Sequence, residues 1–194
     1  MTPNKPQPRT TRDNYEQPPT TSEQLSEVKR KDPVYTQPPL FSEILPRLFM
    51  GGTDDNDVIH VPQRSYAKRI DLPFDSIVTM YAWARPADWN IQEFRYCVPD
   101  ASINEIEIGR LLEAVEFGYK KWKEGDRVLV RCQAGLNRSG LVTALILMHN
   151  GHSAQEAIDL IRARRHEDAL FNEEYVKWLN DEAHARISPS KNAA

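Results

Sequence analysis

Four residues in the stretch VLVRCQAGLNRSG, residues 128–140, are of types suited to attack on a phosphate ester. Cys132 is followed six positions later by Arg138, with Gly135 between them and Ser139 directly after. A cysteine thiolate is a strong nucleophile, and a planar guanidinium matches the oxygens of a phosphate group. Gly135 permits a tight backbone turn, and the Ser139 hydroxyl can donate a hydrogen bond to the sulfur. The spacing therefore predicts nucleophilic attack by sulfur on phosphorus.

The elements around this stretch are expected to build an anion-binding loop. Residues 127–131 are predicted to be a strand with a VLV core, and the apolar run SGLVTALILMHN after Arg138 to be a buried helix. A strand, a short loop and a helix point backbone N–H groups at one spot, where the helix dipole favours an anion and a thiolate. The residues expected to surround the phosphate are Gln133, Ala134, Gly135, Leu136, Asn137 and Arg138.

A cysteine after an apolar strand also has a purely structural interpretation. Most such cysteines are small buried hydrophobes, and an arginine six positions later is not rare by chance. Here the strand, the glycine, the serine after the arginine and the apolar helix occur together. This combination favours the catalytic interpretation of Cys132.

The rest of the chain alternates predicted strands and helices. Ser153 and Glu156 form a capping box that begins a helix running toward Arg165, and Asn172 can cap a last helix. Strands that alternate with helices predict an α/β domain with a central, mostly parallel sheet of about four to five strands flanked by helices. The other segments are 42–52 (a turn into a short strand), 74–83 and 93–98 (strands) and 104–123 (a helix).

Composition and charge exclude several classes of protein. A net charge of −3 is too small to indicate a surface for nucleic acid or acidic membranes. The sequence has no apolar run long enough to span a bilayer, and its start lacks the apolar segment of a secretory signal. Two cysteines form no disulfide framework, which favours a reducing compartment. We therefore expect a cytoplasmic protein.

The loop RCQAGLNRSG resembles the phosphate-binding loop of cysteine-dependent protein phosphatases, H-C-x-x-G-x-x-R-[ST], and particularly that of the dual-specificity group. The resemblance extends over residues 41–182. SEILPRLFMGG is similar to the family's opening segment, GDRVLVRCQAG to its strand into the loop, and SAQEAIDLIRARR with FNEEYVKWL to its closing helices. It implies a phosphatase-type three-layer domain and a phosphocysteine intermediate, formed without a metal or an organic cofactor.

The resemblance also implies a general acid on a loop that precedes the cysteine. The segment YCVPDAS places Asp100 just after a predicted strand and 32 positions before Cys132. Asp100 would protonate the leaving oxygen and then act as the base that activates water. The sequence P-D-A-S is also typical of a turn or a helix cap, which is the alternative role for this aspartate.

The chain is predicted to have three parts. Eight of its 14 prolines lie in residues 1–39, and such a segment buries too little apolar surface to offset its ordering entropy. Residues 1–39 are therefore expected to be a Pro-rich, mostly disordered extension. Residues 40–183 would form the dual-specificity-phosphatase-like catalytic domain, and residues 184–194 a tail.

Arg131 departs from the family pattern. In the family a histidine precedes the catalytic cysteine, whereas this sequence has an arginine at that position. An arginine supplies charge without the geometry of that histidine, so weakened activity or an altered pH profile is expected. The segment MYAWARPADWN follows a strand that should end near the catalytic edge of the sheet, although its aromatic residues could equally serve packing. Cys97 is expected to pack in the core rather than to pair with Cys132. The candidate substrate-lining residues are Tyr81, Trp83, Arg85 and Arg131.

The function expected from these features is hydrolysis of phosphomonoesters by a protein phosphatase acting on phosphotyrosine and phosphoserine or phosphothreonine. One alternative is a catalytically weak or inactive phosphoresidue-binding module, which Arg131 leaves open. Another is a phosphatase for phosphoinositides or RNA 5′-phosphates, whose loops usually carry extra basic residues. The expected partner is a phosphorylated protein or peptide, with no nucleic acid or membrane, and the expected state is a monomer.

Overall fold

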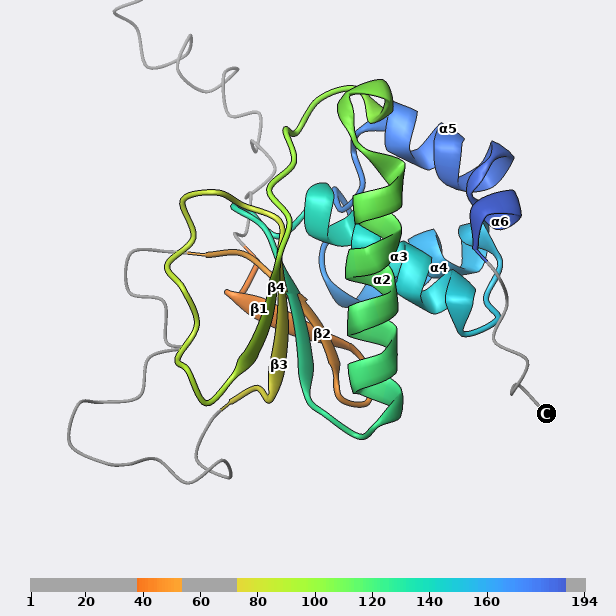
Figure 1. Ribbon diagram of the computed structural model, residues 1–194. Helices are drawn as coiled ribbons and strands as arrows, with labels where there is room; N and C mark the ends of the chain where they lie inside the picture. Colours follow the sequence, from red (N-terminus) through yellow and green to blue (C-terminus); the bar gives the residue numbers. More distant parts are fainter. Residues whose placement is uncertain (1–37, 54–72, 188–194) are drawn as a thin grey trace, which may run out of the picture. The chain divides into compact units, whose positions relative to one another are not determined.

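The computed structural model describes residues 38–53 and 73–187, and the strands in these ranges form one five-stranded sheet (Figure 1). Strands β2, β5, β3 and β4 are parallel neighbours in that order, and β1 pairs antiparallel with β2 at the edge. The predicted mostly parallel sheet is thereby confirmed. The strands are β1 (Phe41–Leu45), β2 (Leu48–Gly51), β3 (Ser76–Thr79), β4 (Gln92–Arg95) and β5 (Val128–Arg131).

β1 and β2 form a hairpin where the sequence predicts a turn followed by a single strand. Pro46 and Arg47 make the connection between them. Arg47 has a φ of 70°, and its N–H donates to the Glu43 carboxylate at 2.9 Å. The first part of the segment is therefore itself a strand, because the side chain of Glu43 stabilises the tight turn after it.

The two faces of β5 bury different neighbours, since successive side chains of a strand point to opposite sides. Val128 and Val130 belong to the main core between the sheet and the helices. Leu129 belongs to a second apolar cluster, to which no helix of the described ranges contributes. Arg131, two positions after Leu129, lies on this second face, whereas Cys132 belongs to the main core. The second cluster consists of Phe74, Ile77, Ile91 and Leu129.

The helices supply much of the main core, and Figure 1 shows α2 and α3 packed beside the sheet. α3 is buried on nearly every side, as its apolar sequence predicts. Ser153 and Glu156 form the predicted capping box of α4, and the Asn172 side chain caps α5 through the Glu174 N–H at 3.0 Å. The helices are α2 (Ile108–Lys123), α3 (Arg138–His149), α4 (Ala154–Arg164), α5 (Glu173–Asp181) and α6 (Ala183–Arg186).

Several predicted bounds differ from the structure. The helix predicted over 104–123 is divided into a 3-10 turn at Ile103–Glu105 and α2, because Ser102 caps the short turn and the backbone is extended at Ile106. The prediction that Cys97 lies in the core is wrong, since it follows the edge strand β4 and is exposed.

The predicted terminal segments are only partly covered by the structure. The extension predicted over residues 1–39 lies outside the described residues except for Pro38 and Pro39. α6 continues the described chain beyond residue 183, where the tail is predicted to begin. No helix in the described ranges is long and apolar enough to cross a membrane.

Candidate active site

The loop of residues 132–137 joins the carboxyl end of the central strand β5 to the first turn of α3. Ligands of parallel sheets bind at this edge, outside the carboxyl ends of the strands. The Cys132 N–H donates to the Gly51 carbonyl at 3.2 Å, which ties the beginning of the loop to β2. The N-terminus of α3 meets the other end of the loop, where its unpaired N–H groups and its dipole favour an anion.

The Cys132 sulfur is buried within this loop and contacts two hydrogen-bonding groups. The residue is 1% exposed. The Gly135 N–H donates to Sγ at 3.3 Å, and the Ser139 Oγ lies 3.3 Å from the same sulfur. Both groups therefore lie within hydrogen-bonding distance of the sulfur, and in the Ser139 contact either atom can be the donor.

Arg138 begins α3 and directs its guanidinium toward the loop that carries Asp100. Its Nη1 donates to the Val98 carbonyl at 3.3 Å, and the Tyr81 ring centroid lies 5.4 Å from its Cζ. The Nε is buried and has no hydrogen-bond acceptor within the described part of the chain, with Asp100 Oδ2 at 3.7 Å. A buried donor without an acceptor is costly, and an oxygen of a bound phosphate would supply one.

The backbone around Asp100 is fixed by three side chains that donate to its carbonyl groups. Burial raises the pKa of Tyr175 to about 12, and the negative charge of Asp100 acts in the same direction. The Tyr175 phenol therefore stays protonated near neutral pH and remains a donor. Asp100 is held beside Arg138 as a result. The bonds run from Arg138 to the Val98 carbonyl (3.3 Å), from Tyr175 to the Pro99 carbonyl (3.3 Å) and from Asn172 to the Ala101 carbonyl (3.0 Å).

Gly135 occupies the position at which the loop requires glycine. Its φ is +72°, and a Cβ placed there would lie 2.3 Å from the Gly51 carbonyl carbon and 2.4 Å from the Gly52 nitrogen. The end of β2 thus packs backbone to backbone against the loop. The Thr53 N–H adds a hydrogen bond of 2.9 Å to the Gln133 carbonyl. The turn at Gly135 is predictable from the sequence, but its contact with β2 is not.

We expect Gly135→Ala to lower the free energy of unfolding by about 3 kcal/mol. The cost of a left-handed backbone for alanine is added to the cost of overpacking its Cβ against β2. Gly125→Ala is the matched control, since Gly125 has a φ of +94° and nothing within 4 Å of its Cβ position. The control should lose only about 1 kcal/mol. Urea unfolding of both variants measures the difference, and equal losses would contradict the close approach of β2 to the loop.

Arg165, directly after α4, binds the carbonyl groups of the loop. It is absent from the predicted site residues. Its Nε donates to the Gly135 carbonyl at 3.0 Å, its Nη2 to the Ala134 carbonyl at 3.4 Å and its Nη1 to the Ser42 hydroxyl at 3.2 Å. Burial lowers the pKa of Arg165, although a nearby Cys132 charge opposes the shift. An arginine keeps its charge in proteins, so the side chain also adds positive charge beside the sulfur.

The remaining loop residues divide into exposed and buried side chains. Gln133 and Ala134 are exposed at the loop and accessible to a substrate. Leu136 and Asn137 are buried, and Asn137 Oδ1 accepts a hydrogen bond from the Asn172 N–H at 3.1 Å. The Asn137 side chain therefore fixes the loop against the N-cap of α5, and both residues can contribute to a bound phosphate through their backbone.

The candidate substrate-lining residues lie in different environments. Tyr81 contacts Arg138 and so belongs to the site. Trp83 is 83% exposed, and Arg85 is also exposed. Arg131 is 0% exposed and lies on the second face of the sheet. With no accessible surface, Arg131 cannot line a substrate pocket, and that part of the prediction is corrected.

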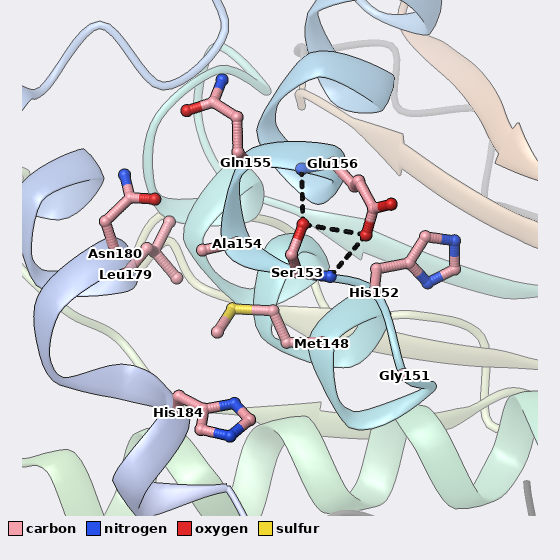
Figure 2. Close-up of a pocket in the computed structure, with 10 residues that line it drawn as sticks. All are labelled: Met148, Gly151, His152, Ser153, Ala154, Gln155, Glu156, Leu179, Asn180 and His184. Carbon is pink, nitrogen blue, oxygen red and sulfur yellow. Dashed lines mark hydrogen bonds between the residues drawn. The ribbon is translucent and has the colours of Figure 1, made fainter.

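A separate pocket of about 510 Å³ lies at the other end of α3, where α4 begins (Figure 2). Figure 2 shows Ser153 and Glu156 on its wall, bonded to each other in the capping box. Arg138 and His149 mark opposite ends of α3, roughly 16 Å apart along the helix axis. This pocket is therefore distinct from the loop of Cys132, and none of the predicted site residues lines it.

The fold and sequence comparisons together define the class of protein. A five-stranded, mostly parallel sheet with flanking helices is the α/β fold found in human DUSP28 and related phosphatases. Residues 60–184 match the family "Dual specificity phosphatase, catalytic domain". The chain belongs to this family. The predicted resemblance is thereby confirmed.

Solved structures share the fold at low sequence identity. Tk-PTP in its active form has a TM-score of 0.61 and 23% identity, over 77% of this chain and 99% of that one. Human DUSP28 has a TM-score of 0.63 and 20% identity, over 78% and 97%. PTPMT1, solved in complex with PI(5)P, has a TM-score of 0.60 and 18% identity, over 77% and 97%. No curated protein sequence matches the chain.

Proposed function

We propose that this phosphatase-family domain hydrolyses phosphomonoesters through a phosphocysteine at Cys132 and acts on phosphorylated proteins. The observation that carries the proposal is the pairing, in one loop, of a buried sulfur with a buried guanidinium Nε that has no acceptor in the described ranges. The sulfur can attack phosphorus, and Arg138 can bind the phosphate oxygens in the bidentate geometry that guanidinium groups favour. Loop N–H groups would bind the remaining oxygens.

In the first proposed step, the Cys132 thiolate attacks phosphorus in line with the leaving oxygen. The sulfur–phosphorus bond forms as the phosphorus–oxygen bond breaks, and Asp100 transfers its proton to the departing alcohol or phenol. Phosphate oxygens in the Arg138 fork would replace Asp100 there, which frees the carboxyl group for the leaving oxygen. The 3.7 Å separation of Asp100 Oδ2 from Arg138 Nε makes this exchange a short movement.

In the second proposed step, water attacks the phosphocysteine and releases inorganic phosphate. The Asp100 carboxylate takes a proton from this water, so the acid of the first step is regenerated. The sulfur–phosphorus bond breaks and the thiolate is restored. The Ser139 hydroxyl, 3.3 Å from Sγ, stabilises the departing sulfur by a hydrogen bond.

The side chains of the loop favour a substrate with a single phosphate on tyrosine, serine or threonine. Residues 133–137, QAGLN, carry no charge, whereas each further phosphate of a phosphoinositide or an RNA 5′-triphosphate calls for further cations. Two basic residues beside the loop, Arg131 and Arg165, are buried, and their guanidinium groups donate to oxygens of the protein itself. Phosphoinositides are the alternative substrates, since PTPMT1 shares the fold and was solved with PI(5)P.

The test is turnover of a chromogenic aryl phosphate by the full chain, followed by a panel of phosphopeptides and of vesicles containing a phosphoinositide. We expect aryl phosphate hydrolysis and release of phosphate from phosphotyrosine and phosphoserine or phosphothreonine peptides. Hydrolysis of the phosphoinositide in the vesicles alone would contradict the proposal that the substrate is a phosphorylated protein. Phosphopeptide binding without any turnover would instead identify a phosphoresidue-binding module.

A further inference from the structure

Arg131, the residue before the nucleophile, is the largest fully buried side chain of the described ranges. It ends β5, and its neighbours in the sheet register are Gly51 on β2 and Thr79 on β3. Because strand side chains alternate, it shares a face with Leu129 rather than with Cys132. Its guanidinium therefore lies on the opposite side of the sheet from the core that surrounds the sulfur.

The guanidinium of Arg131 is bound by a carboxylate, a hydroxyl and a backbone carbonyl. Its Nε donates to Thr79 Oγ1 at 2.9 Å, and its Nη2 donates to Glu93 Oε1 at 3.1 Å and to the Arg85 carbonyl at 2.6 Å. The Thr79 hydroxyl in turn donates to Glu93 Oε1 at 2.6 Å. The buried charge of Arg131 is thus paired, and its Nε and Nη2 donors are used, as a buried ion pair requires.

Glu93 is ionised in this arrangement. Burial alone would raise the pKa of Glu93, but hydrogen bonds from Thr79, Ala87 and Arg131 and the charge of Arg95 outweigh burial and lower it. We call this set of side chains the Arg131–Glu93 clasp. Its members are Arg131, Thr79, Glu93 and Arg95.

The clasp binds the backbone of the β3–β4 loop, residues 80–91, at three points. Arg131 binds the Arg85 carbonyl, Arg95 Nη2 binds the Ala84 carbonyl at 2.8 Å, and Glu93 Oε2 accepts the Ala87 N–H at 3.1 Å. Ala87 also packs against the second apolar cluster. Figure 1 shows this connection, in yellow-green, on the side of the sheet away from α2.

The same loop reaches the phosphate site at its beginning. The Met80 N–H donates to the Arg131 carbonyl at 2.8 Å, and Tyr81 next to it faces the Arg138 guanidinium at 5.4 Å. Trp83 projects from the loop into solvent between Tyr81 and the clasped carbonyls. A loop held at residues 84–87 presents these aromatic rings in one arrangement before a substrate arrives, which lowers the ordering cost of binding.

We propose that Arg131 and Glu93 form a buried clasp that fixes the β3–β4 loop as a preformed wall of the phosphate site. Arg131 is then a positioning residue: it holds the loop that contacts the substrate and does not orient the Cys132 nucleophile. Its role therefore differs from that of the histidine in the family pattern. The inference rests on the proposed function for its kinetic consequences. The placement of the loop itself is independent of that function.

The test compares Arg131→Met, Glu93→Gln and the double variant Arg131→Met/Glu93→Met with the wild-type chain. Arg110→Met is the matched control, because it removes an arginine from an exposed pair with Glu113 at 2.8 Å. Four quantities are measured: hydrogen exchange of residues 81–90, exchange of residues 132–138, the alkylation rate of Cys132 by iodoacetate, and KM against kcat for an aryl phosphate.

We expect exchange of residues 81–90 to accelerate by about tenfold or more in Arg131→Met and Glu93→Gln, the factor expected from losing a hydrogen bond to a charged group. KM should rise by a similar factor while kcat and the alkylation rate change by about threefold or less. The double variant removes both members of the Arg131–Glu93 pair and leaves Arg95, whose side chain is 30% exposed, to solvent and the Ala84 carbonyl. It should therefore recover much of the thermal stability but keep the fast exchange and the high KM. Recovered stability together with a high KM would separate a positioning role of Arg131 from simple destabilisation. The double variant therefore still tests the proposal if a single variant fails to fold.

Slower alkylation of Cys132 with unchanged exchange of residues 81–90 would overturn the clasp and assign Arg131 to the nucleophile. A KM equal to that of the wild type in the double variant would contradict the proposal that the β3–β4 loop is a wall of the phosphate site. If the wild-type chain hydrolyses no substrate, the proposed function fails, yet the exchange and alkylation measurements still decide whether Arg131 holds the loop. The two failures are therefore distinguishable.

Discussion

The Cys132→Ser variant should lose phosphatase turnover by at least about a thousandfold while it still binds phosphate. Serine is close in size to cysteine, and the Gly135 and Ser139 contacts to its position would persist. A hydroxyl remains protonated where a thiol ionises, so the variant has no nucleophile to attack phosphorus. The Arg138 guanidinium and the loop N–H groups are unchanged, and these carry the affinity for the anion.

Cys97→Ser is the control for this substitution, because Cys97 is the other cysteine of the chain and is exposed. It should retain full turnover.

Acid quenching of the wild-type chain during turnover, followed by trypsin, should yield the phosphorylated peptide of residues 132–138, which arginines 131 and 138 delimit. Turnover by Cys132→Ser within about tenfold of the wild type would rule out a phosphocysteine at this position.

Features of the site that depend on neighbouring residues were predictable from the sequence. The strand, loop and helix around Cys132 are continuous in the chain, and the glycine turn and the apolar run of α3 identify them. The caps of α4 and α5 are equally local, since Ser153 and Asn172 bond to residues two or three positions ahead. The alternation of these elements was sufficient to predict the mostly parallel sheet.

Features that depend on backbone groups far away in the chain were not predictable. Arg165 binds the Gly135 and Ala134 carbonyls, which lie 30 and 31 positions before it, and its own sequence context, RARR, does not distinguish it from its neighbours. Tyr175 binds the carbonyl of Pro99, 76 positions away. A carbonyl acceptor has no signature in the amino-acid sequence, because every residue has one.

Arg131 shows why a substitution in a family pattern needs the three-dimensional neighbours for its interpretation. Beside Cys132 in the sequence, it suggested a cation at the mouth of the site. The alternation of β5 instead turns it to the second face, where Glu93, 38 positions away, pairs with it. Sequence proximity to the sulfur therefore does not place its guanidinium at the sulfur.

The Asp100→Asn variant should show a loss that depends on the leaving group, which is the most specific consequence of a general acid. For a phosphoserine peptide, whose alkoxide leaves poorly without a proton, kcat should fall by about a hundredfold to ten-thousandfold. An aryl phosphate with an acidic phenol needs little protonation, so its loss should be much smaller. Asparagine keeps the shape of the side chain, and the bonds from Tyr175 and Asn172 to the adjacent carbonyls should hold the loop in place.

Asp159→Asn, on the exposed face of α4, is the matched control and should leave both substrates unaffected. A ratio of the two losses near one in Asp100→Asn would mean that the carboxyl group does not protonate the leaving oxygen. Its position 3.7 Å from Arg138 Nε would then serve only to orient the guanidinium. A large ratio, with unchanged alkylation of Cys132, would instead assign the proton transfer to Asp100, because orientation of Arg138 affects every leaving group alike.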